Sequence, residues 1–305
     1  MPLRRRAPSQ VLLLCLLGIL LAACSRQPQE LAGATSEPAA AVRDLVGYVQ
    51  RDDLAGFAKA AVPAEDYAAL DQAWRENRSR WPLTELPLED RLVPLLQALS
   101  APNAEANLQR SFDRQFARQD TDLRDAARSL GLFGVQYVKN EGHYTPDQRH
   151  HYTQVINALS AWGQDAPLGD PALARNTIKS LAAAARTAGI DSEEDLSQAG
   201  MEDSLRRLSP FLAATKASFT RYGLPLDTSL SELRTGLVQQ QGDHATVRIH
   251  YPLGDREIDS QVKLERRGGR WYFSDYLAEA ARARAGAVAS APDQPPITLP
   301  PEDAD

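Results

Sequence analysis

The hydrophobic pattern of most of the chain has the period of an α-helix. From residue 41 to about residue 223, apolar residues recur every three or four positions, as in Val42, Leu45 and Val49. Residues with this spacing lie on one side of a helix, and that side is buried when the helix packs against a neighbour. The pattern therefore predicts a body of many helices across residues 41–226.

Capping signals predict where several of these helices begin and end. Thr145-Pro146 followed by Gln148 has the sequence of a capping box with proline at the first helical position. Asp170-Pro171 predicts a second helix start, and Gly189 predicts its end. Asn103 precedes an apolar period and predicts a third start, capped by its side chain. Ser209-Pro210 predicts a break between two shorter helices, because proline cannot donate the helical hydrogen bond.

Two apolar stripes predict buried helix faces. The first includes Trp81 and the second follows residue 120, and each has spacings of three, four or seven. The predicted members of the first stripe are Tyr67, Leu70, Trp74 and Trp81, and those of the second are Leu123, Ala127, Leu130, Gly134 and Tyr137.

After Gly223 the period changes from helical to two. Ala245, Val247 and Ile249 alternate with polar residues, which predicts a strand with one buried and one solvated face. Four strands are predicted at 233–240, 245–251, 257–266 and 270–275, with a closing helix at 276–284. The predicted fold class is α+β, mainly α: a multi-helix body followed by a four-stranded antiparallel β-meander and a short C-terminal helix. The meander and its helix span residues 227–285.

Both ends of the chain differ in composition from the folded part. Residues 24–40 have few apolar side chains and predict a flexible tether. Residues 286–305 are rich in proline and acids and predict a disordered acidic tail. Proline-rich tails also serve as docking peptides, and this alternative remains open.

The first 23 residues have the layout of a secretory signal peptide. Arg4, Arg5 and Arg6 precede a leucine-rich run and a small-residue cleavage site. The run is too short for a permanent membrane helix.

The end of this leader, Leu21-Ala22-Ala23-Cys24, resembles the lipobox of bacterial lipoproteins. The resemblance implies that Cys24 is acylated and becomes the first residue, which would anchor the protein to a membrane through its acyl chains. Ser25, in place of Asp, implies the outer membrane, facing the periplasm, rather than the inner membrane. The alternative is an ordinary signal peptide cleaved near Ala23.

Cysteine content and charge exclude several classes of function. The chain has two cysteines, Cys15 in the leader and Cys24 at the lipobox, so no thiol remains for a disulfide or for catalysis. The formal net charge is −6, and removal of the arginine-bearing leader makes the mature chain more acidic. A nucleic-acid partner is therefore not expected.

The last strands resemble those of a known family. The segments from Gly242 and from Gly269-Arg270-Trp271-Tyr272-Phe273 are similar to the sheet of the cystatin-like and nuclear-transport-factor-like α+β fold, which many small bacterial lipoproteins carry. The resemblance implies a curved sheet packed on helices, but the long helical region before the sheet departs from the family.

Three residues near one helix start are candidate metal ligands. His143, Asp147 and His151 lie within nine residues, and Asp147 and His151 share a helix face. A solvated helix start explains the same residues without a metal. Neither a metal nor a cofactor is predicted.

Arginines repeat every four residues at Arg110, Arg114 and Arg118. Such a stripe can bind acidic groups of a partner or lipid phosphates. Because aspartates such as Asp113 and Asp120 lie nearby, we expect an exposed, salt-bridged face instead.

No catalytic motif is present, and the four tryptophans have positions typical of a core. The sequence therefore favours a lipid-anchored periplasmic protein with a non-enzymatic interaction or structural role, through an envelope protein partner. An alternative is a binding module for a small apolar or envelope-derived ligand between sheet and helices. A hydrolase would need polar residues gathered around His143, His150 or His151.

Overall fold

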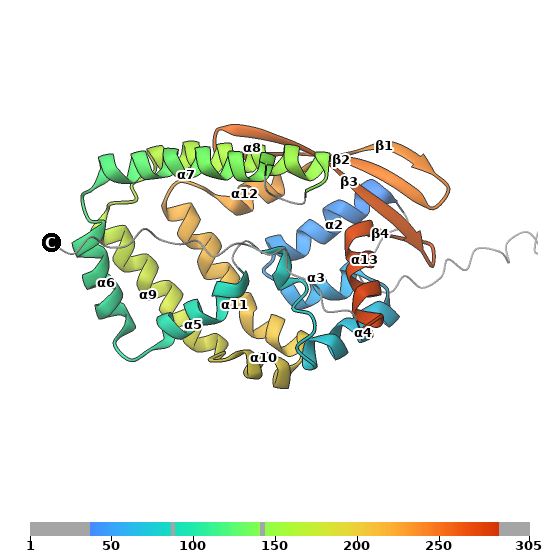
Figure 1. Cartoon of the computed structure of the whole chain (residues 1–305), viewed down its shortest axis with the longest axis horizontal. Helices are drawn as coiled ribbons and strands as arrows, with labels where there is room; N and C mark the ends of the chain where they lie inside the picture. The colour runs from blue at the N-terminus through green and yellow to red at the C-terminus, as the bar shows by residue number, and fades with distance from the viewer. Residues whose placement is uncertain (1–36, 87–88, 141–143, 287–305) are drawn as a thin grey trace, which may run out of the picture. The chain divides into compact units, whose positions relative to one another are not determined.

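The computed structural model describes residues 37–86, 89–140 and 144–286 (Figure 1). The elements follow one another as α2 (Pro38–Gln50), α3 (Leu54–Ala61), α4 (Ala64–Arg75), η1 (Leu83–Glu85), η2 (Glu89–Arg91), α5 (Leu92–Ser100), α6 (Ala104–Gln115), α7 (Asp120–Asn140), α8 (Pro146–Asp165), α9 (Pro171–Ala188), α10 (Glu193–Ala199), α11 (Met201–Arg221), α12 (Leu226–Ser231), β1 (Arg234–Gln241), β2 (His244–Leu253), β3 (Arg256–Arg267), β4 (Arg270–Phe273) and α13 (Ser274–Arg284).

This order confirms the predicted fold class. A body of helices precedes a four-stranded antiparallel sheet, and a short helix closes the described chain, so the fold is α+β and mainly α.

Local capping signals gave most helix boundaries correctly. Thr145 Oγ1 accepts a hydrogen bond from the Gln148 backbone N–H over 3.2 Å, and Gln148 Oε1 accepts one from the Thr145 N–H over 3.0 Å, which completes the capping box. Asp170 caps α9, and Gly189, with φ of 56°, ends it. The start predicted after Asn103 is confirmed, because α6 begins at Ala104, but the predicted cap is wrong: Asn103 has φ of 60°, and its side chain makes no capping hydrogen bond.

The predicted break at Pro210 was also wrong, because α11 is one continuous helix. Leu208 and Phe211, on either side of the proline, are both buried. Packing on this scale offsets the hydrogen bond that proline removes.

The main core lies around two tryptophans. Trp74 is completely buried, and its Nε1 donates to the Leu196 carbonyl over 2.8 Å. Trp81 is also buried, but it follows the end of α4 instead of extending that helix's stripe, which corrects the prediction. Its ring contacts Phe57 and Tyr276, with centroids 6.3 and 5.4 Å away, so this loop belongs to the core.

A buried lysine joins α11 to the end of α2. Lys216 Nζ donates to the carbonyls of Val49 and Gln50 over 3.0 and 2.8 Å. It also forms ion pairs with Asp52 at 2.8 Å and Asp227 at 2.5 Å. These partners satisfy a charge that would otherwise be costly to bury.

The sheet is a simple meander with the order β1-β2-β3-β4. Its hairpins turn at glycine-containing loops, which lie between the strands that the sequence predicted. Gly242 and Gly254 have φ of 58°, and Gly268 has φ of 56°. Glycine adopts this left-handed region without the strain that a side chain would add.

Two helices cover the inner face of the sheet. Val42 of α2 packs against Val247 and Ile249, whereas α8 packs against Leu253 and Ile258 through Ala158 and its neighbours. The space between sheet and helices is filled by side chains at both places.

Candidate functional site

The helices α7 and α8 form a hairpin with a seam of small side chains. A β-carbon on Gly131 would lie 2.3 Å from Ser160 Oγ, and one on Gly163 would lie 3.2 Å from the Ala127 β-carbon. Ser160 Oγ also donates to the Ala127 carbonyl over 3.0 Å. Close packing of this kind fixes one side of α7 firmly against α8.

Beside the seam, α7 carries an apolar flank that is open to solvent. The exposed fractions of Leu130 and Phe133 are 69% and 66%. Residues at 130, 133 and 137 share one side of a helix, so Tyr137 continues this flank. The exposed fraction of Leu132 is 67%, but this residue lies about 100–160° away from those three residues around the helix axis, so it is not part of the flank. The sequence had predicted that Leu130 is buried with Ala127; only the small residues enter the seam.

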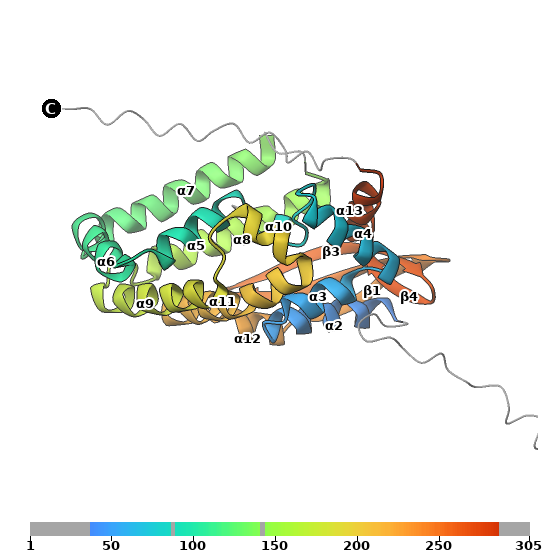
Figure 2. The ribbon, with the colours of Figure 1, turned by 90° about the horizontal axis from the view of Figure 1, so that it is seen from below.

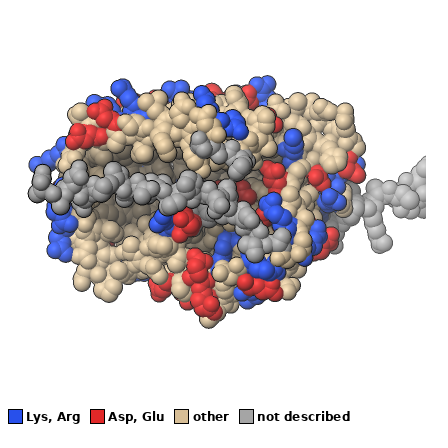
Figure 3. Space-filling view, in the orientation of Figure 1, with Lys and Arg blue, Asp and Glu red and all other residues tan. Residues whose placement is uncertain are grey.

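Aromatic rings continue from this flank onto α8. The rings of Phe133 and Tyr137 stack with centroids 6.5 Å apart, and those of Tyr144 and Tyr152 meet edge to face at 5.1 Å. Tyr137 lies close enough to Tyr144 to help raise the pKa of the Tyr144 phenol, after burial, the main cause. We call Leu130, Phe133, Tyr137, Tyr144 and Tyr152 the aromatic row. Figure 3 shows a hollowed face below α7.

Carboxylates lie at one end of the aromatic row. Glu85 is exposed, and yet the surrounding protein withdraws part of the water from its carboxyl group. This desolvation, reinforced by Asp275 and then Glu279, raises the pKa of Glu85 to about 7. Burial raises the pKa of the Tyr152 phenol, and the charge of Glu85 adds to that effect. The row therefore ends at Tyr152, within electrostatic range of Glu85 of η1 and Asp275 of α13.

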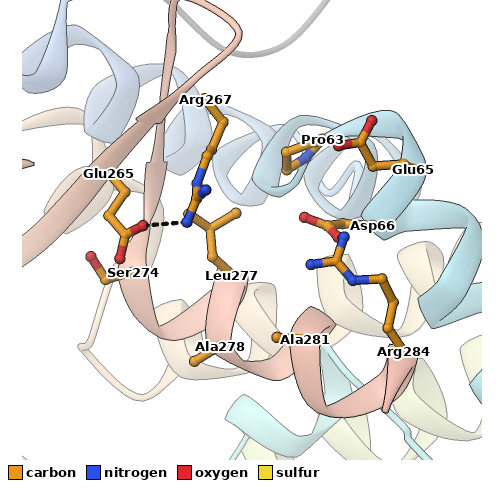
Figure 4. A pocket seen from close by; sticks show the side chains of 10 residues that line it. All are labelled: Pro63, Glu65, Asp66, Glu265, Arg267, Ser274, Leu277, Ala278, Ala281 and Arg284. Carbon is orange, nitrogen blue, oxygen red and sulfur yellow. Dashed lines mark hydrogen bonds and ion pairs between the residues drawn. The ribbon is translucent and has the colours of Figure 1, made fainter. Parts of the chain in front are cut away.

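A separate cavity of about 320 Å³ lies where α4, β3 and α13 meet (Figure 4). Asp66, in the first turn of α4, is 4% exposed and forms an ion pair with Arg284 of α13. Arg267 and Glu265 of β3 form a second pair at 2.8 Å. Burial raises the pKa of Asp66 despite the two arginines. The lining is thus charged, with an aliphatic floor from α13 that includes Leu277, Ala278 and Ala281.

The candidate metal ligands do not form a site in the part of the chain that is described. His143 lies outside the described residues, Asp147 is exposed, and His151 is half-buried with its ring 6.2 Å from that of Tyr251. Burial lowers the pKa of His151, and the nearby His150 adds to this effect. Among the described residues, no three metal-ligating side chains converge.

His250 lies beside a carboxylate on the sheet, as a catalytic histidine often does. His250 Nε2 lies 3.6 Å from Asp259 Oδ1, and the Arg248 guanidinium binds the same carboxylate, with Nε at 2.9 Å from Oδ1. This arginine is the first cause of the lowered pKa of Asp259. Within the described ranges, neither this pair nor His151 has a hydrogen-bonded serine or threonine hydroxyl that would act as a nucleophile.

The expected salt bridges of the arginine stripe are not formed. Arg110 Nη2 donates to Asn107 Oδ1 over 2.6 Å, and Arg114 donates to Ser111 Oγ over 3.4 Å. Neither these two nor Arg118 pairs with a carboxylate of the described residues. Asp113 instead accepts a hydrogen bond from Gln109 over 2.7 Å. The three arginines are exposed and have no carboxylate partner in the described part of the chain.

The tryptophans behave largely as predicted. Trp74, Trp81 and Trp271 are at most 2% exposed. Trp162 is half-buried, and its Nε1 donates to the Tyr222 carbonyl over 2.8 Å.

The sequence patterns did not predict an exposed aromatic surface on α7 or a group of carboxylates beside it. Phe133 and Tyr137 are four apart on a helix that also carries a glycine seam, and this combination was the available signal. Glu85, Tyr152 and Asp275 come from three distant segments, so no local pattern connects them.

Comparisons with known proteins add no relative: no protein-family model, curated protein or solved structure matches the chain. Of the helices in the described ranges, none has the length and apolar character needed to cross a membrane.

Proposed function

We propose that this chain is a lipid-anchored envelope protein without enzymatic activity, which binds an extended segment of a partner protein along the aromatic row. The observation that supports this function is the exposure of Leu130 and Phe133, two-thirds open on a helix held from one side. The anchor is Cys24, and the location is the periplasmic side of the outer membrane.

Exposed apolar rows of this kind favour association. Burial of one leucine or phenylalanine side chain contributes about 1.5–3 kcal/mol. Aromatic residues are enriched at the centres of protein interfaces because they bury a large area with few rotatable bonds. Leu130, Phe133 and Tyr137 supply such an area on one helix, next to the tyrosines of α8.

Photo-crosslinking tests this function. A photoreactive phenylalanine analogue is placed at position 133 or, as the matched control, at position 132 of the same helix. In intact cells we expect an adduct with a second protein from position 133 and little from position 132. Equal yields from both positions, or none from either, would contradict a partner on the aromatic row.

The anchor has a separate test. Cys24→Ala removes the acylated thiol, so we expect loss of fatty-acid labelling and release from the membrane fraction. Labelling that persists in the variant would exclude Cys24 as the lipid site. A chain that is unlabelled in both forms would support the ordinary signal peptide instead.

The alternative proposal is a binding module for a small ligand, and the cavity in Figure 4 favours it. Its arginines and carboxylates fit an envelope-derived ligand with carboxylate and ammonium groups better than an apolar one, because charged side chains form strong hydrogen bonds to groups of opposite charge. Titration calorimetry with free amino acids tests this proposal. Binding that is lost in Arg267→Ala would support it, and an absence of heat with every amino acid would refute it.

A further inference from the structure

We propose that residues 287–305 of the same chain occupy the aromatic row when no partner is bound. In this arrangement the proline-rich part lies on the tyrosines and the acidic end lies at the arginines of α6. The inference rests on the proposed function, because it uses the same surface. It makes the row a site for which the protein's own tail and a partner segment compete.

The chemistry of the two surfaces is complementary. Proline-rich segments favour an extended polyproline II helix, and grooves lined by aromatic side chains recognise that helix at a small entropic cost. The tail carries Pro295-Pro296 and Pro300-Pro301, with Ile297 and Leu299 between them. The aromatic row offers one phenylalanine and three tyrosines, whose rings pair between Phe133 and Tyr137 and between Tyr144 and Tyr152.

The tail begins near the correct end of the row. The described chain ends at Gly286, directly after α13, and the first turn of α13 contains Asp275, which acts on the pKa of Tyr152. At 1.5 Å per residue, α13 is about 16 Å long and α7 about 32 Å. The tail in polyproline II form reaches more than about 50 Å. It is therefore long enough to follow the row to the beginning of α7 and the arginines that precede it.

Charge sets the direction of the tail. Its first residues, from Ala287 to Pro292, carry no charge and pass the carboxylates of Glu85 and Asp275 without repulsion. Its last residues, Pro-Glu-Asp-Ala-Asp, carry three acidic side chains. Arg110, Arg114 and Arg118, which have no carboxylate partner among the described residues, lie on α6 and the turn after it, at the other end of α7. The aspartates of this region lower its net charge, but none of them forms an ion pair with these three arginines in the described part of the chain.

The covalent link makes this contact effective even if it is weak. A tethered segment has an effective concentration in the millimolar range, so a modest intrinsic affinity keeps the site occupied. A partner must then bind the row more tightly than the tail does, or be present at a higher local concentration than the effective concentration of the tail. The tail thus shields apolar side chains that would otherwise promote aggregation.

The test uses the purified full chain with the photoreactive residue at position 133 or 132. We expect an intramolecular adduct between position 133 and a peptide within residues 287–305, with little from position 132. The yield should not depend on protein concentration. Adducts that join two chains, adducts elsewhere in the chain, or equal yields from both positions would overturn the proposal.

A second variant tests the charge contact without touching the folded part. Glu302→Gln, Asp303→Asn and Asp305→Asn together should lower the yield from position 133 severalfold at low salt. An unchanged yield would show that the acidic end does not bind the arginines and would overturn the proposed direction of the tail. Loss of the tail adduct in purified protein, with the cellular adduct retained, would refute this inference alone. The reverse result would refute the partner and leave the tail in place.

Discussion

The helices α9 and α7 are both held by small residues, yet only one is enclosed. In α9, Ala182, Ala185 and Ala188 are buried, and the helix contacts α5, α6 and α11 (Figure 2). In α7, Gly131 is buried against α8, but Leu130 and Phe133 stay open. A seam of small residues therefore indicates which two helices pack together. Whether the other sides of each helix are buried depends on additional neighbouring helices.

The largest expected difference between the main core and the α7–α8 hairpin lies in the loss of unfolding free energy when an aromatic ring is removed. Trp74→Ala should lower the free energy of unfolding by about 3–5 kcal/mol, because the ring is fully buried and its hydrogen bond to Leu196 is lost. Phe133→Ala should change it by no more than about 0.5 kcal/mol. Urea unfolding measures both. A large loss in Phe133→Ala would show that α7 is enclosed after all.

A change in the seam should have an intermediate effect. Gly131→Val places side-chain atoms against Ser160, so we expect a loss of about 1–3 kcal/mol and faster hydrogen exchange in α7. Gly236→Val in β1 is the matched control, because no atom lies within 4 Å of its β-carbon position. Equal effects of the two substitutions would mean that the seam is not closely packed.

The carboxyl group at the end of the aromatic row should give a smaller, pH-dependent effect. The pKa of Glu85 is raised from 4.5 to about 7, so the folded state binds this proton more tightly than the unfolded state. Its contribution to stability is present below about pH 4.5 and is lost as the pH rises through about 7. Glu85→Gln should flatten this part of the stability profile. An unchanged slope between pH 4.5 and pH 7 would exclude a raised pKa.

The smallest effect on stability should come from two exposed leucines of α7. Leu130→Ser and Leu132→Ser should each change the free energy of unfolding by no more than about 0.5 kcal/mol. They should differ in binding: only Leu130→Ser should reduce the adduct formed from position 133. Equal reductions of the adduct yield in both variants would show that binding is not confined to the side of α7 that carries Leu130.

Features that depend on neighbours in sequence were predictable. The capping box at Thr145, the end of α9 at Gly189 and the glycine turns of the meander follow from local backbone chemistry. Features that depend on packing were not. Trp81 is buried from a loop, and Pro210 is tolerated in α11, because contacts from distant segments outweigh local preference.

The candidate site shows the same limit. The helical period placed Leu130 and Ala127 on one side of α7, and the two positions do lie within about 60° of each other around the helix axis. The period carries no information, however, about whether another helix or strand covers that side. The carboxyl cluster at Glu85 combines η1 with α13, nearly two hundred residues apart in the chain. Only the folded arrangement brings such groups together.

Side-chain footprinting in intact envelopes tests most directly whether the open flank of α7 is a binding surface. Phe133 and Tyr137 should react with a solvent-borne radical or carbene much less than Leu132 does, although Phe133 and Leu132 have nearly the same exposed fraction, 66% and 67%. Equal labelling of Phe133 and Leu132 in envelopes, scaled to their intrinsic reactivities, would contradict the account.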